Sequence, residues 1–247
     1  MRVAMAIAAC IVCCMPAAAF PGEGPIIDIE AGLVMSGYND VRIPGDTGTL
    51  FSLVDDLETD RSFYYRVRLS YIIGERHTFS LLAAPLRLEA EGTPGRPIIY
   101  EGETFEADES LDALYRFDSY RLTYRYEIHR SPRLRFGIGV TAKVRDASIE
   151  VESEERRAEK KNTGLVPLLN FSLMWRFSSR SGVLLQGDAL AAPQGRAEDA
   201  QLSLFYEAGR NVTVRFGYRI LEGGADNDEV YNFALLHYGL LGVSFSF

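Results

Sequence analysis

The stretch RSFYYRVRLSYII, residues 61–73, alternates between two kinds of side chain. One set of alternate positions carries Phe63, Tyr65, Val67, Leu69 and Tyr71, and the other carries Tyr64, Arg66, Arg68 and Ser70. Successive side chains of a β-strand point to opposite faces, whereas the face of a helix repeats every 3.6 residues. The stretch is therefore predicted to be a β-strand with one apolar face and one largely charged face.

The same alternation recurs along the chain and predicts about ten strands. We expect them at residues 26–38, 61–73, 77–91, 112–128, 133–152, 163–178, 181–193, 199–208, 211–223 and 229–247. Two of these segments contain a phase slip in the apolar pattern, across Pro85 and after Arg145. Both slips are interpreted as β-bulges, because one extra residue exchanges the two faces of a strand.

The start of the chain has the features of a signal peptide. Arg2 precedes an apolar stretch that ends at Pro16 and the small residues 17–19, a suitable cleavage site. We assign residues 1–19 to this peptide, and residues 20–247 to a single all-β domain. All three cysteines (Cys10, Cys13 and Cys14) lie in the peptide, so no disulfide is expected in the mature protein.

Composition excludes two classes of protein. A net charge of −8 and a pI near 5.0 argue against a nucleic-acid partner, which requires a basic face. After the first segment there is no apolar run of about 18 residues, so helical membrane spans are excluded as well.

Connection lengths distinguish a soluble sandwich from a transmembrane barrel, since both would show the alternation. Tight connections at 74–76, 130–133, 178–181 and 209–211 alternate with longer ones at 39–60, 91–112, 153–162, 193–199 and 223–229. Aromatic residues gather on the apolar face near the tight connections: Tyr71, Phe79, Tyr124, Tyr126, Phe136, Trp175, Phe177, Tyr206, Phe216, Phe245 and Phe247. Short turns, long outer loops and an aromatic girdle predict a closed antiparallel up-and-down transmembrane β-barrel.

The final segment ends in an aromatic residue at the last position. Tyr231, Phe233, Leu235, Leu241, Val243, Phe245 and Phe247 share one face of it. Here the chain resembles the outer-membrane β-barrel proteins of Gram-negative bacteria. The resemblance implies that Tyr231, Phe245 and Phe247 form the signal read by the barrel-assembly machinery. It also implies a bacterial outer-membrane location, with membrane lipid and lipopolysaccharide as surroundings, and we expect a monomer.

Strand number limits what the lumen can do. Eight strands leave an interior filled by side chains and 16–18 leave an aqueous channel, so ten predict a narrow lumen. Its expected charges are Arg66, Arg68, Arg121, Arg125, Arg135, Lys143, Arg176, Arg215 and Arg219, together with Asp28, Glu30, Glu127, Asp188 and Glu207. These charges either form a salt-bridged structural core, because unpaired buried charges are costly, or leave an excess of arginine along an anion path.

No catalytic group is predicted. His77 and His129 lie beside tight turns, and His237 is in phase with the apolar face. The resemblance to omptin-type outer-membrane proteases, which use Asp and His at the outer rim, stops at strand number. Barrel-type lipid A deacylases use a Ser–His pair near the outer leaflet, whereas the His-x-Ser triplet of this chain, His129 to Ser131, lies at a tight turn.

Two outer loops carry unusual patterns. Asp226, Asp228 and Glu229 on the loop 223–229 either form a solvated acidic rim or a weak Ca²⁺ site, and no other cofactor is expected. The apolar run 49–54 either packs over the barrel mouth or extends a strand.

The sequence therefore predicts a non-enzymatic outer-membrane barrel with a structural or surface-interaction role. Acidic loops would bridge to lipopolysaccharide through divalent cations. Passage of small solutes is the first alternative, and modification of membrane lipid is the second.

Overall fold

The computed structural model describes residues 23–192 and 195–247. The predicted signal peptide lies outside these residues. The barrel wall consists of β1 (Gly24–Arg42), β4 (Ser62–Ile73), β5 (His77–Ala84) continued by β6 (Arg87–Gly92), β9 (Leu111–Arg130), β10 (Leu134–Glu152), β11 (Arg157–Arg176), β12 (Ser181–Ala192), β13 (Gly195–Glu207), β14 (Val212–Asp226) and β15 (Tyr231–Ser246). No helix in the described residues is long and apolar enough to cross a membrane.

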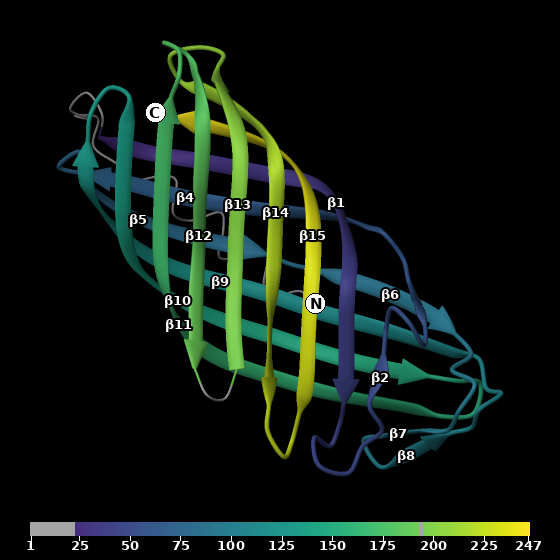
Figure 1. Cartoon of the computed structure of the whole chain (residues 1–247). Coiled ribbons are helices and arrows are strands. Elements are labelled where there is room, and N and C mark those ends of the chain that lie inside the picture. Colours follow the sequence, from purple (N-terminus) through teal and green to yellow (C-terminus); the bar gives the residue numbers. More distant parts are fainter. Residues whose placement is uncertain (1–22, 193–194) are drawn as a thin grey trace.

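Each wall strand pairs antiparallel with its neighbours in the chain, and the sheet closes on itself. The last strand β15 pairs with β1 along its length, with Phe245 opposite Ile27. In Figure 1 the strands β12 to β15 cross in front of β9 to β11, as expected for strongly tilted strands. The predicted closed antiparallel barrel of ten strands is confirmed.

The exterior of the barrel is apolar over a broad band. The large exposed side chains include Ile29, Leu33, Phe63, Leu69, Leu81, Leu122, Ile138, Val140, Leu165, Leu169, Leu202, Leu204, Phe216 and Leu241. Water-soluble monomers rarely expose so extensive an apolar surface, whereas a transmembrane barrel presents it to lipid. Most of the predicted aromatic girdle lies on this face, and only Tyr124 and Phe136 are half-buried.

Three strands on one side extend far beyond this band. β9, β10 and β11 have 19 or 20 residues each, about twice the 9–11 residues with which a tilted strand crosses a membrane. Their outward positions change from apolar to charged above Tyr120 and Val144. There Asp118 pairs with Arg87, and Arg116 pairs with Asp146 at 3.0 Å. This ion ladder marks where the wall leaves hydrocarbon and enters water.

The inward positions change in the opposite sense at the same level. Ile149 and Val151 lie on the same strand face as Arg145, and Leu88 lies on the same face as Leu82. The register with β9 is unchanged between Ala84–Ser119 and Arg87–Arg116, and it runs without a shift through Arg145.

The two bulges predicted at Pro85 and after Arg145 are therefore wrong. The apolar residues move to the interior because the solvent outside changes, and this exchange has the appearance of a phase slip in the sequence. Register shifts occur instead between Ser36 and Tyr38 in β1, and between Phe136 and Gly137 where β10 faces β9.

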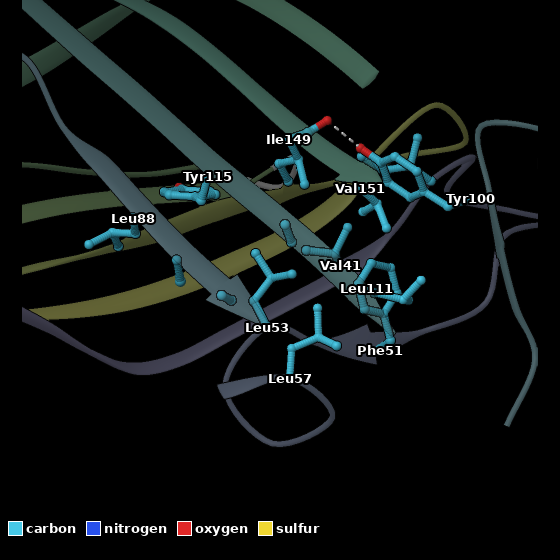
Figure 2. Packing of buried hydrophobic residues seen from close by; sticks show 14 of the residues in the cluster. Val41, Phe51, Leu53, Leu57, Leu88, Tyr100, Leu111, Tyr115, Ile149 and Val151 are labelled. Atoms are coloured by element: carbon cyan, nitrogen blue, oxygen red, sulfur yellow. Dashed lines mark hydrogen bonds between the residues drawn. The ribbon is translucent and has the colours of Figure 1, made fainter. Parts of the chain in front are cut away.

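The outer loops fill the mouth of the barrel with an apolar plug. It consists of the short strands β2 (Phe51–Ser52), β3 (Glu58–Thr59), β7 (Ile98–Tyr100) and β8 (Glu103–Phe105) and the loop residues beside them. Phe51 and Tyr100 meet edge to face with ring centroids 6.0 Å apart, and the Tyr100 hydroxyl donates to the carbonyl of Ile149 at 2.8 Å. Figure 2 shows these side chains packed against Val41, Leu111 and Val151 of the wall. Burial raises the pKa of Tyr100, so this donor keeps its proton.

The apolar run 49–54 both extends a strand and packs over the barrel mouth, the two alternatives considered from the sequence. Phe51 pairs with Val41 and so adds a short strand to β1, and the side chains of Phe51 and Leu53 are buried in the plug. The hairpin of β7 and β8 was not predicted from the sequence.

Three outer loops are shorter than predicted, because the wall strands continue into water. β11 begins at Arg157 rather than 163, β13 begins at Gly195 rather than 199, and β14 extends to Asp226. Charged side chains pair across these extensions, as Arg157 does with Glu150 at 2.8 Å. The many charged residues therefore led to the prediction of loops where the structure has strands exposed to water.

Arginine on the exterior of the band should destabilise the barrel. Val140→Arg places a charge among the lipid tails, and such a substitution near the membrane midplane costs about 2–4 kcal/mol. Denaturant titration of the protein folded into liposomes should show this loss. Asp112→Arg, at an exposed position of β9 above the ion ladder, is the control and should change the free energy of unfolding little. Equal stability of the two variants would remove the assignment of this face to lipid.

Candidate functional site

Inside the wall, the most densely packed polar cluster surrounds Asp199 of β13. Three arginines reach this carboxylate: Arg66 at 3.1 Å, Arg121 at 2.7 Å, and Arg219 through a short hydrogen bond. They come from β4, β9 and β14, so one carboxylate joins four strands. The cluster therefore ties opposite sides of the wall together.

Further acceptors surround two of these arginines, Arg121 and Arg219. Arg219 donates to Glu30 at 2.8 Å and to the Gln201 carboxamide oxygen at 2.5 Å. Arg121 donates to Asp188 at 2.7 Å, and Asp188 also accepts from Thr141 at 2.6 Å and from Asn170 at 2.8 Å. Such extensive pairing offsets the cost of removing charges from water.

Further ion pairs continue toward the end with the tight turns. Arg215 contacts Asp28 at 2.6 Å, Arg176 contacts Glu207 at 2.5 Å, and Arg135 pairs with Glu127. Glu127 also accepts from Arg130 at 3.0 Å. The structure thus brings together most of the charges expected in the lumen.

Three of the expected lumen cations have no carboxylate within 4.0 Å in residues 23–192 and 195–247. They are Arg68, Arg125 and Lys143. Paired charge dominates the lumen, as the structural interpretation required. These three cations are the excess positive charge to which the anion-path interpretation refers.

Asp199 itself was missed as a lumen residue. The sequence analysis placed it at the first position of a strand, next to an expected loop, and strand ends carry the weakest periodicity. The polar alternation Asp199, Gln201, Ser203 would have assigned it to the inward face.

Exposure shows that the centre of the lumen is filled. The side chains of Arg66, Arg121, Arg219, Glu30, Asp188 and Asp199 are only 2–5% exposed to solvent. Charged side chains along a water-filled channel would be wet, so the cross-section at this level is closed by side chains. The apolar plug closes the outer mouth above it.

A cavity remains between the charged cluster and the outer end of the wall. It has a volume of about 400 Å³, within the range of small-ligand sites. Arg121, Lys143 and Asp188 line its charged part, and Phe117, Ile149 and Leu168 line apolar parts. No sequence pattern singled out this cavity.

The histidines lie away from both the cavity and the outer rim. His77 sits beside a tight turn, where its Nδ1 is 2.9 Å from the hydroxyl of Tyr124. His129 is in the last turn-side residues of β9. His237 lies on the outer face of β15 against Tyr218. None of the three histidines therefore lies at the outer end of the barrel.

The loop interpreted as either a solvated acidic rim or a weak Ca²⁺ site is a turn held by Asn227. The Asn227 carboxamide oxygen accepts from the backbone N–H groups of Glu229 at 3.0 Å and Val230 at 2.9 Å. Among the described residues, no three His, Cys, Asp or Glu side chains are grouped so as to hold a metal ion. The structure thus does not gather Asp226, Asp228 and Glu229 into a site.

The terminal strand has the features that the resemblance required. Tyr231, Phe245 and Phe247 lie on its outward face, and Phe245 and Phe247 are exposed. The Phe247 N–H donates to the carbonyl of Pro25 at 3.1 Å, next to the closure between β15 and β1.

Comparison with solved structures agrees with this architecture. The outer-membrane protease OmpT from Escherichia coli superposes with a TM-score of 0.60 at 9% identity, over 93% of this chain and 99% of that chain. This chain has the fold of an outer-membrane β-barrel protein. Its apolar exterior is that of a barrel that spans a lipid bilayer.

Two further solved barrels are less similar. Ail, the attachment invasion locus protein of Yersinia pestis, has a TM-score of 0.39 at 12% identity, over 91% of this chain and 99% of that chain. An outer membrane channel from Pseudomonas putida F1 has a TM-score of 0.45 at 11% identity, over 95% of this chain and 100% of that chain. No protein-family model and no curated protein sequence matches the outer-membrane barrel described here.

Removing the charge of Asp199 should be severely destabilising. Asp199→Asn leaves three buried arginines without their shared carboxylate, and breaking a buried ion pair costs about 3–5 kcal/mol. Denaturant unfolding followed by the fluorescence of the single tryptophan, Trp175, should show this loss. Glu207→Gln breaks a half-exposed pair with Arg176 and should cost about 0–1 kcal/mol. Similar values for both variants would show that the central cluster does not stabilise the lumen.

Proposed function

We propose that this protein is a closed outer-membrane barrel with a structural or surface-interaction role, rather than a pore. The observation that carries the proposal is the filled lumen, in which the central charged side chains are buried and paired. Two barriers stand in series: the ion-paired cluster around Asp199 and the apolar plug around Phe51 and Tyr100. Diffusion of a solute would require both to rearrange.

The outer end supports a role at the cell surface. Ion pairs hold its loops in place. Arg96 pairs with Asp56 at 2.9 Å, and Lys160 of β11 pairs with Glu101 at 3.0 Å. Leu50 and Ile99 are exposed at its tip, where the Thr49 N–H donates to the Ile99 carbonyl at 2.9 Å. A rigid end with exposed apolar residues is suited to contact a surface partner.

The expected partners follow from the same surfaces. Acidic outer residues would contact lipopolysaccharide through divalent cations, and the outward aromatic face of β15 would be the part recognised by the barrel-assembly machinery. The two alternatives are less well supported. Solute passage conflicts with the filled cross-section, and lipid modification lacks a histidine at the outer end.

Conductance tests the closed lumen. The native protein in a planar bilayer should show no steady single-channel current. Replacing residues 94–109 by a short Gly-Ser linker removes the β7–β8 hairpin and should still leave the bilayer sealed, because the Asp199 cluster remains. Adding Asp199→Ala and Arg219→Ala to that deletion should produce current, because the centre of the charged cluster is then lost together with the β7–β8 part of the plug. Stable current steps from the native barrel would overturn the proposal in favour of solute passage.

Epitope display tests the orientation. Gly95 lies in the loop before β7, with open space around its Cα and a positive φ of 69°. An epitope inserted there should be labelled by antibody on intact cells. The same epitope inserted at Gly209, in a tight turn with open space around it, should be labelled only after the outer membrane is permeabilised. The reverse pattern would contradict the assignment of the loop end to the cell surface.

A further inference from the structure

One of the places where the hydrogen-bonded wall is open lies between β11 and β12. The ladder between β11 and β12 runs from Arg176–Gly182 only as far as Leu169–Ala189. Beyond it, β12 continues to Ala192 paired with β13, and the described part of β11 before Leu169 pairs with β10 alone. In Figure 1 the two strands separate, with β12 ending at the lower centre and β11 running to the lower right.

This opening lies at the depth of the lipid-facing band. On the closed side of β11, Leu169 is opposite Val140 and Leu165 is opposite Val144, and all four side chains face outward and are exposed. Unpaired backbone groups at membrane depth are tolerated only where they line a cavity or are covered by protein. Pro167 lies within the open stretch and has no N–H, as is typical of a strand edge.

The outer cavity lies directly behind the opening. Leu165, Val166, Pro167 and Leu168 of β11 and Leu190 of β12 line its apolar side. Lys143 lines its charged side, and in the β10–β11 ladder Lys143 is opposite Val166. The opening, the apolar wall and the ammonium group are therefore at one level of the barrel.

Lys143 is one of two cations of the cavity, with Arg145, that have no carboxylate within 4.0 Å among residues 23–192 and 195–247. Lys143 is 4% exposed, and its Nζ lies 4.7 Å from the centre of the Phe117 ring. No carboxylate of residues 23–192 and 195–247 lies within 4.0 Å of this nitrogen. Arg121 pairs with Asp188 and Asp199, Lys160 with Glu101, and Arg196 with Glu222. Arg145 donates to the carboxamide oxygen of Asn162, which carries no charge. A buried ammonium without an anion is costly, and an anionic ligand would relieve this cost.

We propose that this cavity binds an amphipathic carboxylate, of the fatty-acid class, which enters from the outer leaflet between β11 and β12. Its carboxylate lies at Lys143, and its alkyl chain lies along Leu165, Leu168 and Leu190. Lys143, with Arg145 on the same face of β10, supplies positive charge for a carboxylate head group, and the opening faces hydrocarbon rather than water. The site lies above the closed centre of the lumen. A failure of the labelling experiment would therefore leave the predicted absence of conductance unchanged.

Photolabelling tests the site in the intact barrel. The protein in lipid nanodiscs is illuminated with a dodecanoic acid that carries a diazirine on its chain, and labelled peptides are identified by mass. The label should appear in residues 163–176 and 181–192. Lys143→Met should reduce this labelling about tenfold or more, because a charged hydrogen bond is lost. Lys161→Met removes an exposed lysine outside the cavity and should leave it unchanged.

Three comparisons keep the test decisive even if Lys143→Met fails to fold. In the native protein, unlabelled dodecanoate should compete and dodecanol should not, because only the acid can pair with Lys143. Hexanoate, which remains largely in water, should compete far more weakly than dodecanoate, and equal competition would overturn the lateral route. Labelling that is equal for acid and alcohol, or spread over the whole exterior band, would show annular lipid only and would overturn the site.

Discussion

The structure depends on one constraint: the wall strands pass from hydrocarbon into water partway along their length. Within the membrane the apolar side chains must face outward, and the interior holds the charged ones. Ion pairs hold this interior together, and Asp199 is shared by three arginines. Above the membrane the exterior carries the ion ladder from Arg87 to Asp146, and the interior becomes an apolar core. The same strands thus use two opposite arrangements, and the level of exchange sets the position of every other feature.

Most of the barrel could be predicted from period-two alternation, because the alternation fixes which face of each strand is apolar. A register error of one residue would turn every side chain of a strand to the opposite face. The predicted segments match the wall strands closely through the membrane. The errors concentrate where the surroundings change. Apolar Leu88 and Ile149 shifted to the other set of positions, and this was interpreted as bulging when the register was constant. Charged residues such as Arg157 were interpreted as loop because a strand in water carries charge on its outer face.

The lumen was predicted in composition but not in connectivity. Alternation assigns Arg66, Arg121 and Arg219 to the interior, yet it cannot show that they meet, because they are far apart in sequence and approach only after closure. Asp199, at the centre of the charged cluster, was missed because it lay at the end of a predicted strand. The outer cavity could not be predicted at all, since it arises where a ladder stops, and Pro167 is the only residue in the sequence that marks this position.

The exchange of polarity along a strand also governs which sequence changes the protein can accept over evolutionary time. On β10, Val140 and Val151 are both valines, but one contacts lipid and the other is packed against the plug. A homologue that inhabits a thicker or thinner membrane would have to move the exchange point on all strands together. Drift at single positions cannot do this, so the height of the band should be inherited as a unit while the residues within each zone vary freely.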